Sequence, residues 1–116
     1  MLGWRAYRKD VKARVGDLAA AAPDALKGYF ALSTSGEKAK HLDAKTRELI
    51  SIAVAVTTRC DGCIASHIEA AIQYGATEEE LSEALGVAIA MNAGAALVYS
   101  ARAMDCFKEM SAPPSS

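Results

Sequence analysis

The sequence predicts an all-α fold, a single-domain bundle of about six helices over residues 1–116. Two patterns support this prediction. Apolar side chains recur at spacings of three and four residues, and helix-capping residues precede several of these segments. With 116 residues, of which 52% are hydrophobic and 23% charged, the chain has an ordinary globular composition. It is also long enough to bury a core without disulfides.

The first helix is expected to run from Trp4 to about Leu18. Its apolar stripe consists of Trp4, Tyr7, Val11, Val15 and Leu18. Its other side is basic and carries Arg5, Arg8, Lys9, Lys12 and Arg14. We expect the stripe to face the core and the basic side to face solvent, as in most helices of globular proteins. The alternative is a basic amphipathic helix that lies on a membrane or on an acidic partner.

Pro23 suits the first turn of a second helix, which is expected to continue through Leu32 and to end in the polar residues 33–36. Asp43 is the expected N-cap of a third helix over residues 44–57. This third segment is apolar nearly all round. It is therefore expected to be buried on every side.

A fourth helix is expected over residues 61–74, with Gly75 at the C′ position that glycine favours. Residues 77–80, Thr-Glu-Glu-Glu, form a capping box for a fifth helix. Residues 92–94, Asn-Ala-Gly, are expected to break or kink this helix. A sixth helix then continues to about Met110.

Small residues are frequent in these last two helices: Gly86, Ala88, Ala90, Ala93, Gly94, Ala95, Ala96 and Ala101. Faces of this kind bury little area per residue, so a lone chain would have a thin core. We therefore expect the subunits to associate. The tail, residues 111–116, is expected to fray.

Charge and hydropathy exclude several classes of partner. Thirteen basic and fourteen acidic side chains leave a formal charge of -1, so no overall field attracts nucleic acid or an anionic membrane. The start of the chain lacks the apolar segment of a signal peptide. The longest apolar stretch, Leu49–Val56, is too short to span a bilayer. We expect a cytoplasmic protein with no nucleic-acid or membrane partner.

The most informative motif is Cys60-x-x-Cys63 followed by His67. A pair of cysteines at a helix N-terminus can close a small disulfide, and the helix dipole stabilises a thiolate there. His67 lies four residues after Cys63, on the same helical face, and can exchange a proton with it. In a reducing compartment such a pair is more typical of catalysis or metal binding than of a structural link.

The alternative reading of these cysteines is a structural thiol pair or half of a zinc site. Zinc would need a fourth ligand from Cys106, His41 or a carboxylate, and a second Cys-x-x-Cys is missing. The redox dithiol is therefore favoured, with no metal and no cofactor. Cys106 is interpreted as a small core or interface residue, and His41 as an ordinary loop histidine.

Glu48 stands at the beginning of the most apolar segment, on one helical face with Ile52 and Ala55. If that face is carried into the interior, the carboxylate needs a partner there. The alternative is a solvated first-turn residue that interacts with the helix dipole.

Glu48, eleven intervening residues, and then Cys60-x-x-Cys63-x-x-x-His67 form a specific pattern. An alanine-rich helix and Gly-Ala-Thr at residues 75–77 follow it. Over about residues 25–107 the chain resembles alkylhydroperoxidase D (AhpD) and its relatives in the carboxymuconolactone decarboxylase superfamily. The resemblance implies an all-helical bundle that assembles as a homotrimer or homohexamer.

The resemblance also implies roles for the site residues. Cys63 would be the peroxidatic thiol and Cys60 the resolving thiol, with Glu48 and His67 relaying protons. The substrate would be a small hydroperoxide, and the disulfide would be reduced by an external dithiol or a disulfide-reducing protein. Gly62 stands where the longer AhpD proteins carry a histidine. The decarboxylases that name the superfamily lack the cysteine pair, which makes lactone chemistry a weaker alternative.

Helix geometry sets a condition on this reading. In one straight helix Glu48 would lie roughly 18 Å from Cys60, too far for contact. We therefore expect the third helix to end or bend before Cys60. Glu48 is then expected within one bridging water of Cys63 or His67.

Overall fold

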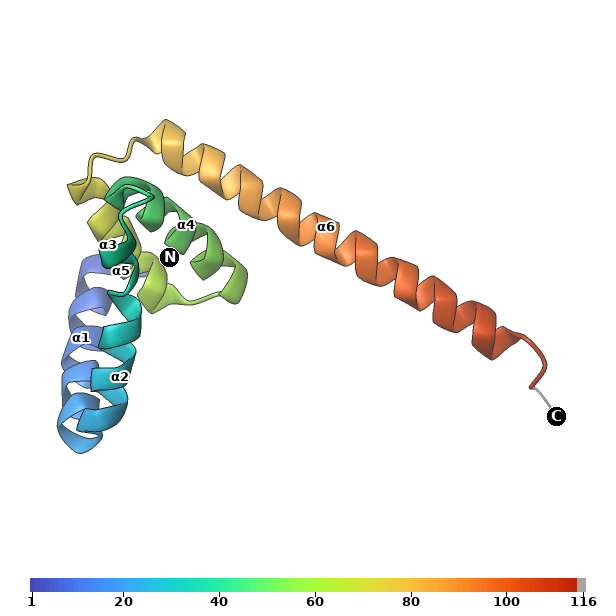
Figure 1. The fold of residues 1–116 in the computed structure, drawn as a ribbon, viewed down its shortest axis with the longest axis horizontal. Coiled ribbons are helices and arrows are strands. Elements are labelled where there is room, and N and C mark those ends of the chain that lie inside the picture. The colour runs from blue at the N-terminus through green and yellow to red at the C-terminus, as the bar shows by residue number, and fades with distance from the viewer. Residues whose placement is uncertain (115–116) are drawn as a thin grey trace.

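The computed structural model describes residues 1–114, and all of its regular secondary structure is helical (Figure 1). The helices are α1 (Trp4–Ala21), α2 (Pro23–Ser33), α3 (Gly36–Ala39), α4 (Ala44–Thr58), α5 (Asp61–Gln73) and α6 (Glu78–Ser111). Over these residues the all-α prediction is confirmed. The expected frayed tail begins at Ser111, which is still helical, and its last two residues lie outside the described part of the chain.

The helices form two hairpins and one long arm (Figure 1). Helices α1 and α2 pack side by side, as do α4 and α5, and α1 also packs against α5. The first part of α6 packs against α4, and the rest extends away from the other helices. The α4–α5 hairpin is therefore the centre of the fold.

The expected capping residues define the helix ends. Asp43 Oδ1 accepts a hydrogen bond of 2.7 Å from the backbone N–H of Thr46 at the start of α4. Thr77 and Glu80 form both hydrogen bonds of the capping box that begins α6. Pro23 occupies the first turn of α2, and Gly75 follows α5 with a φ of 82°, where glycine is favoured. These predictions are confirmed.

The expected break at residues 92–94 is wrong, because α6 is one continuous helix of 34 residues. The Asn92 side chain stabilises the helix: its Nδ2 donates to the carbonyl of Ala88 at 2.7 Å and to Thr57 Oγ1 of α4 at 3.0 Å. A glycine inside a helix costs only about 1 kcal/mol relative to alanine. Gly94 alone therefore does not end so long a helix.

Two further expectations need correction. Residues 36–39 form the short helix α3, where only a polar connection was expected. Helix α4 is not buried on every side. Ile52 and Ala55 are buried, but Ile50 and Val54 are 49% and 56% exposed. An apolar sequence shows that burial is needed, but not whether the covering element belongs to the same chain.

The single chain is far from compact. Its radius of gyration is 19.9 Å, whereas a compact domain of this length has about 13 Å. Its accessible surface is 9324 Å², against about 6,100 Å² for a compact monomer of this mass. Every described residue from 95 onward is exposed. The excess surface comes largely from α6.

Helix α6 is also long and apolar enough to cross a bilayer, judged by length and composition alone. Its most apolar 18-residue window has a mean hydropathy of 1.6, and 6% of that window is buried. The segment Leu49–Val56 is therefore not the longest apolar region. Alanine, glycine and serine separate the large apolar residues of α6, so the sequence shows no long run of large apolar residues there.

An ion pair between Lys45 and Glu80 holds the start of α6 against α4, with Lys45 Nζ 2.7 Å from Glu80 Oε2. The hydrogen bond between Glu80 and Lys45 lowers the pKa of Glu80 below the ordinary 4.5, and the hydrogen bond from the backbone of Thr77 lowers it further, by a smaller amount. The same pair raises the pKa of Lys45. The stabilising effect of Glu80 is therefore present above pH 4.5 and is lost as the pH falls through the lowered pKa.

Glu80→Gln tests this contact, because glutamine keeps the capping box and removes the charge. At pH 7 we expect a slightly lower urea midpoint than in the wild type. As the pH falls below 4.5, the two midpoints should converge, because Glu80 becomes protonated in the wild type. Chemical denaturation followed by circular dichroism measures both. A difference that persisted unchanged to pH 2 would show that the lost charge is not the cause.

Candidate redox site

The two cysteines lie at the turn that joins α4 to α5. Arg59 ends α4 in the left-handed conformation, with φ 55° and ψ 46°. Cys60 follows in extended conformation as the N-cap of α5, and its Sγ accepts a hydrogen bond of 3.2 Å from the backbone N–H of Cys63. The motif is thus placed at the positive end of α5, where the backbone N–H of Cys63 points at the Cys60 sulfur.

Cys60 and Cys63 are joined by a disulfide, with their Cα atoms 5.2 Å apart. This separation lies within the usual range for disulfides. Both residues are half-buried, so a small reagent can reach them. One turn of helix therefore holds a pair of sulfurs that can be joined without rearranging the backbone.

Glu48 and His67 form a direct pair between α4 and α5. Glu48 Oε2 lies 2.6 Å from His67 Nδ1, and the two side chains are 19% and 35% exposed. The expected proximity is therefore observed, and no bridging water is needed. The helix ends at Thr58, as the geometry required, and α5 returns alongside α4.

The pairing fixes the roles of the two ring nitrogens. A carboxylate only accepts hydrogen bonds, so Nδ1 carries a hydrogen and donates a hydrogen bond to Glu48. In this tautomer of the neutral ring, Nε2 is a hydrogen-bond acceptor. Because Cys63 lies one turn before His67 in α5, both side chains project from the same face.

A small hollow of about 110 Å³ adjoins the Glu48–His67 pair. It is lined by Ser33, Gly36, Glu37, Ala44, Arg47, Glu48, Ser51, His67 and Tyr74. Arg47 is fixed within it, since its Nη1 donates to the carbonyl of Leu42 at 2.6 Å. The hollow has room for a few water-sized molecules. Sequence reasoning missed Arg47 and Tyr74, because no spacing connects them to the cysteine motif.

The other candidate ligands lie apart. Among residues 1–114, no three side chains of His, Cys, Asp or Glu converge in a way that could hold a metal ion. Cys106 is exposed on α6, so it is not a core residue, and its role at an interface stays a prediction. His41 is exposed in the connection before α4, as expected of a loop residue.

Comparison with known proteins gives a consistent result. Residues 23–105 match the carboxymuconolactone decarboxylase family. The chain is 47% identical over 104 residues to an uncharacterised protein of Haemophilus influenzae, covering 90% of this chain and 92% of that one. It is 30% identical over 103 residues to an uncharacterised protein of Cupriavidus necator, covering 89% and 91% of the two chains.

A solved structure is also similar. It is the crystal structure of an apo carboxymuconolactone decarboxylase family protein from Legionella pneumophila. The TM-score is 0.73 at 36% identity, and the match covers 94% of this chain and 97% of the other. The region that matches the family, residues 23–105, includes the whole α4–α5 hairpin with its cysteines.

Proposed function

The chain belongs to the carboxymuconolactone decarboxylase family, and from its site we propose that it is an AhpD-like thiol peroxidase and disulfide reductase. One observation carries the proposal. A Cys60–Cys63 disulfide caps α5, one turn before a histidine that a carboxylate orients. The site needs no cofactor, because thiol chemistry supplies both electrons. We place the reaction in the cytoplasm, where dithiol reductants are abundant.

The reaction begins with the reduced dithiol. His67 takes the proton of Cys63, and the thiolate attacks one oxygen of the hydroperoxide. The O–O bond breaks, Cys63 becomes a sulfenic acid, and the other oxygen leaves as an alcohol once it receives the proton. Cys60 then gives up its proton and its thiolate attacks the Cys63 sulfur. The S–S bond forms, the S–O bond breaks, and the leaving hydroxide takes up that proton to become water. An external dithiol restores both thiols by exchange and is itself oxidised to a disulfide.

Two features of α5 support this sequence of steps. The N-terminal end of the helix stabilises negative charge on both sulfurs, which favours the attacking thiolate and the leaving thiolate. The hydrogen bond from the Cys63 N–H to Cys60 Sγ strengthens when that sulfur is charged. Glu48 keeps the His67 ring in one tautomer and stabilises the imidazolium that forms.

Serine variants separate the two thiols. Cys60→Ser keeps an N-cap side chain and should trap Cys63 as a sulfenic acid, detected as a dimedone adduct by mass spectrometry. Cys63→Ser should not consume tert-butyl hydroperoxide. The wild type should lose two thiols per subunit for each peroxide and keep Cys106, which serves as the internal control. A Cys63→Ser protein that turned over at the wild-type rate would contradict the assignment.

Glu48→Gln tests the proton relay. Glutamine keeps the shape of the side chain but loses the charge that orients and stabilises His67, so peroxide turnover should fall by a factor of about 10²–10⁴. Glu37→Gln is the matched control, because it removes a carboxylate from the same hollow without touching His67. Stopped-flow oxidation of the reduced proteins gives the rates. Equal rates for the wild type and Glu48→Gln would remove Glu48 from the mechanism.

We also propose that the active form is a homotrimer or homohexamer in which the far part of α6 packs against other copies. The excess surface of the lone chain, about 3,000 Å² over a compact monomer, is in the range that permanent interfaces bury. The side chains of Leu97, Val98 and Phe107 are 65–73% exposed. Burial between subunits accounts for the apolar composition of α6 without a membrane.

Light scattering of the wild type should give three or six times the chain mass of 12.2 kDa. Leu97→Lys should shift the protein to smaller species, because it places a charge in the buried contact. Glu83→Lys is the control, since it adds the same side chain to α6 at an exposed polar position. A soluble, stable wild-type monomer at micromolar concentration would overturn the proposal.

A further inference from the structure

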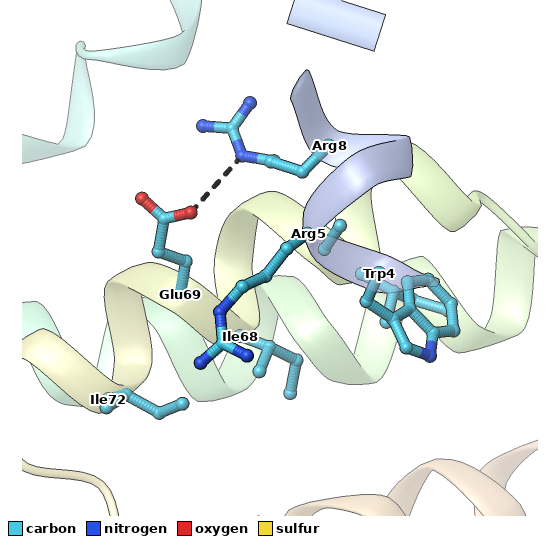
Figure 2. A pocket seen from close by; sticks show the side chains of 8 residues that line it. Trp4, Arg5, Arg8, Ile68, Glu69 and Ile72 are labelled. Carbon is cyan, nitrogen blue, oxygen red and sulfur yellow. Dashed lines mark ion pairs between the residues drawn. The ribbon is translucent and has the colours of Figure 1, made fainter. Parts of the chain in front are cut away.

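A second hollow lies between α1 and α5, apart from the cysteines and the Glu48–His67 pair. It has a volume of about 450 Å³ and is lined by Trp4, Arg5, Arg8, Ile64, Ala65, Ile68, Glu69 and Ile72 (Figure 2). The isoleucines recur every four residues and form one apolar stripe along α5. The volume falls within the range of pockets that hold small molecules, about 300–1,000 Å³.

Two arginines of α1 project over this apolar floor (Figure 2). Arg8 Nε lies 3.7 Å from Glu69 Oε2, is buried, and makes no hydrogen bond within residues 1–114. Arg5 forms no ion pair among the described residues. Two guanidinium groups thus face one carboxylate. A buried N–H donor without an acceptor is rare in folded proteins and is satisfied when a ligand oxygen reaches it.

The hollow is separate from the redox site. Ile64 directly follows Cys63, and Ile68 directly follows His67. The isoleucine stripe is therefore about 100° around α5 from the face that carries Cys63 and His67. None of the four proposed catalytic residues lines the hollow. Its use is therefore independent of whether the protein is a peroxidase.

We propose that this hollow binds an amphipathic monocarboxylate with an aliphatic tail. The tail lies along the isoleucine stripe and Trp4, and the carboxylate takes hydrogen bonds from Arg5 and from Arg8 Nε. Arginine suits this role because its planar group pairs with both oxygens of a carboxylate. Glu69 offsets one of the two arginines, so the lining carries one net positive charge. A ligand with a single negative charge is therefore favoured, and Glu69 repels a more highly charged anion.

Trp4 is the only tryptophan of the chain, so its fluorescence reports on this hollow. Titration with decanoate, below its critical micelle concentration, should change the Trp4 emission with saturation. Across shorter straight-chain carboxylates, affinity should rise about two- to fourfold for each added methylene. Decan-1-ol should bind more weakly than decanoate, because it cannot match the arginines.

Variants test the charged contact. Arg5→Gln should weaken decanoate binding by about 10- to 100-fold, as expected for loss of a hydrogen bond to a charged group. Arg14→Gln is the matched control, because it removes the same charge from an exposed position of α1, where Arg14 pairs with Asp17. Ile72→Ser should weaken binding in proportion to tail length. Far-UV circular dichroism of each variant checks that α1 and α5 remain folded.

Four results would overturn the proposal. Equal binding of decan-1-ol and decanoate would show that the hollow binds apolar tails without recognising the carboxylate. Equal binding by Arg5→Gln and Arg14→Gln would remove the carboxylate contact. A Trp4 emission that depended on protein concentration without ligand would assign this face to a second copy of the chain. A change seen only with vesicles containing phosphatidylglycerol would assign it to a membrane.

Discussion

The reversal of the chain between α4 and α5 determines where the functional groups lie. One left-handed residue, Arg59, and one extended residue, Cys60, turn the backbone so that α5 returns along α4. Without that turn, Glu48 would lie far from the cysteines, as the length of a straight helix requires. With it, residues 19 positions apart form a hydrogen bond of 2.6 Å. The site therefore depends on a backbone conformation more than on any one side-chain contact.

Cys60 connects this backbone feature to the proposed chemistry, because one sulfur both caps α5 and forms the disulfide with Cys63. An N-cap acceptor stabilises a helix, and the end of the helix stabilises charge on the acceptor. In the proposed reaction, the same hydrogen bond would be stronger when Cys60 is a thiolate, because a charged sulfur is the better acceptor. Reduction of the disulfide would then leave the cap in place.

Local signals between neighbouring residues predicted most of the helices. Asp43, Thr77 and Pro23 act within one turn of chain, so their effects could be read from neighbouring residues. The failed prediction at residues 92–94 had a distant cause: Asn92 bonds to Thr57 on another helix and to its own helix backbone. Likewise, periodicity placed Glu48 and His67 on helical faces. Only the known spacing of a family pattern suggested that they meet.

The positions of α4 and α6 are linked at two places along α4. Lys45 pairs with Glu80 near one end, and Thr57 receives the Asn92 hydrogen bond near the other. Glu48 lies between these two contacts in the sequence of α4, the helix that packs against both α5 and α6. Among the described residues, no element covers α6 from residue 95 onward, so a second subunit that packed there would also restrain α4 through this helix. In the proposed oligomer, contacts on α6 would therefore also restrain the helix that carries Glu48.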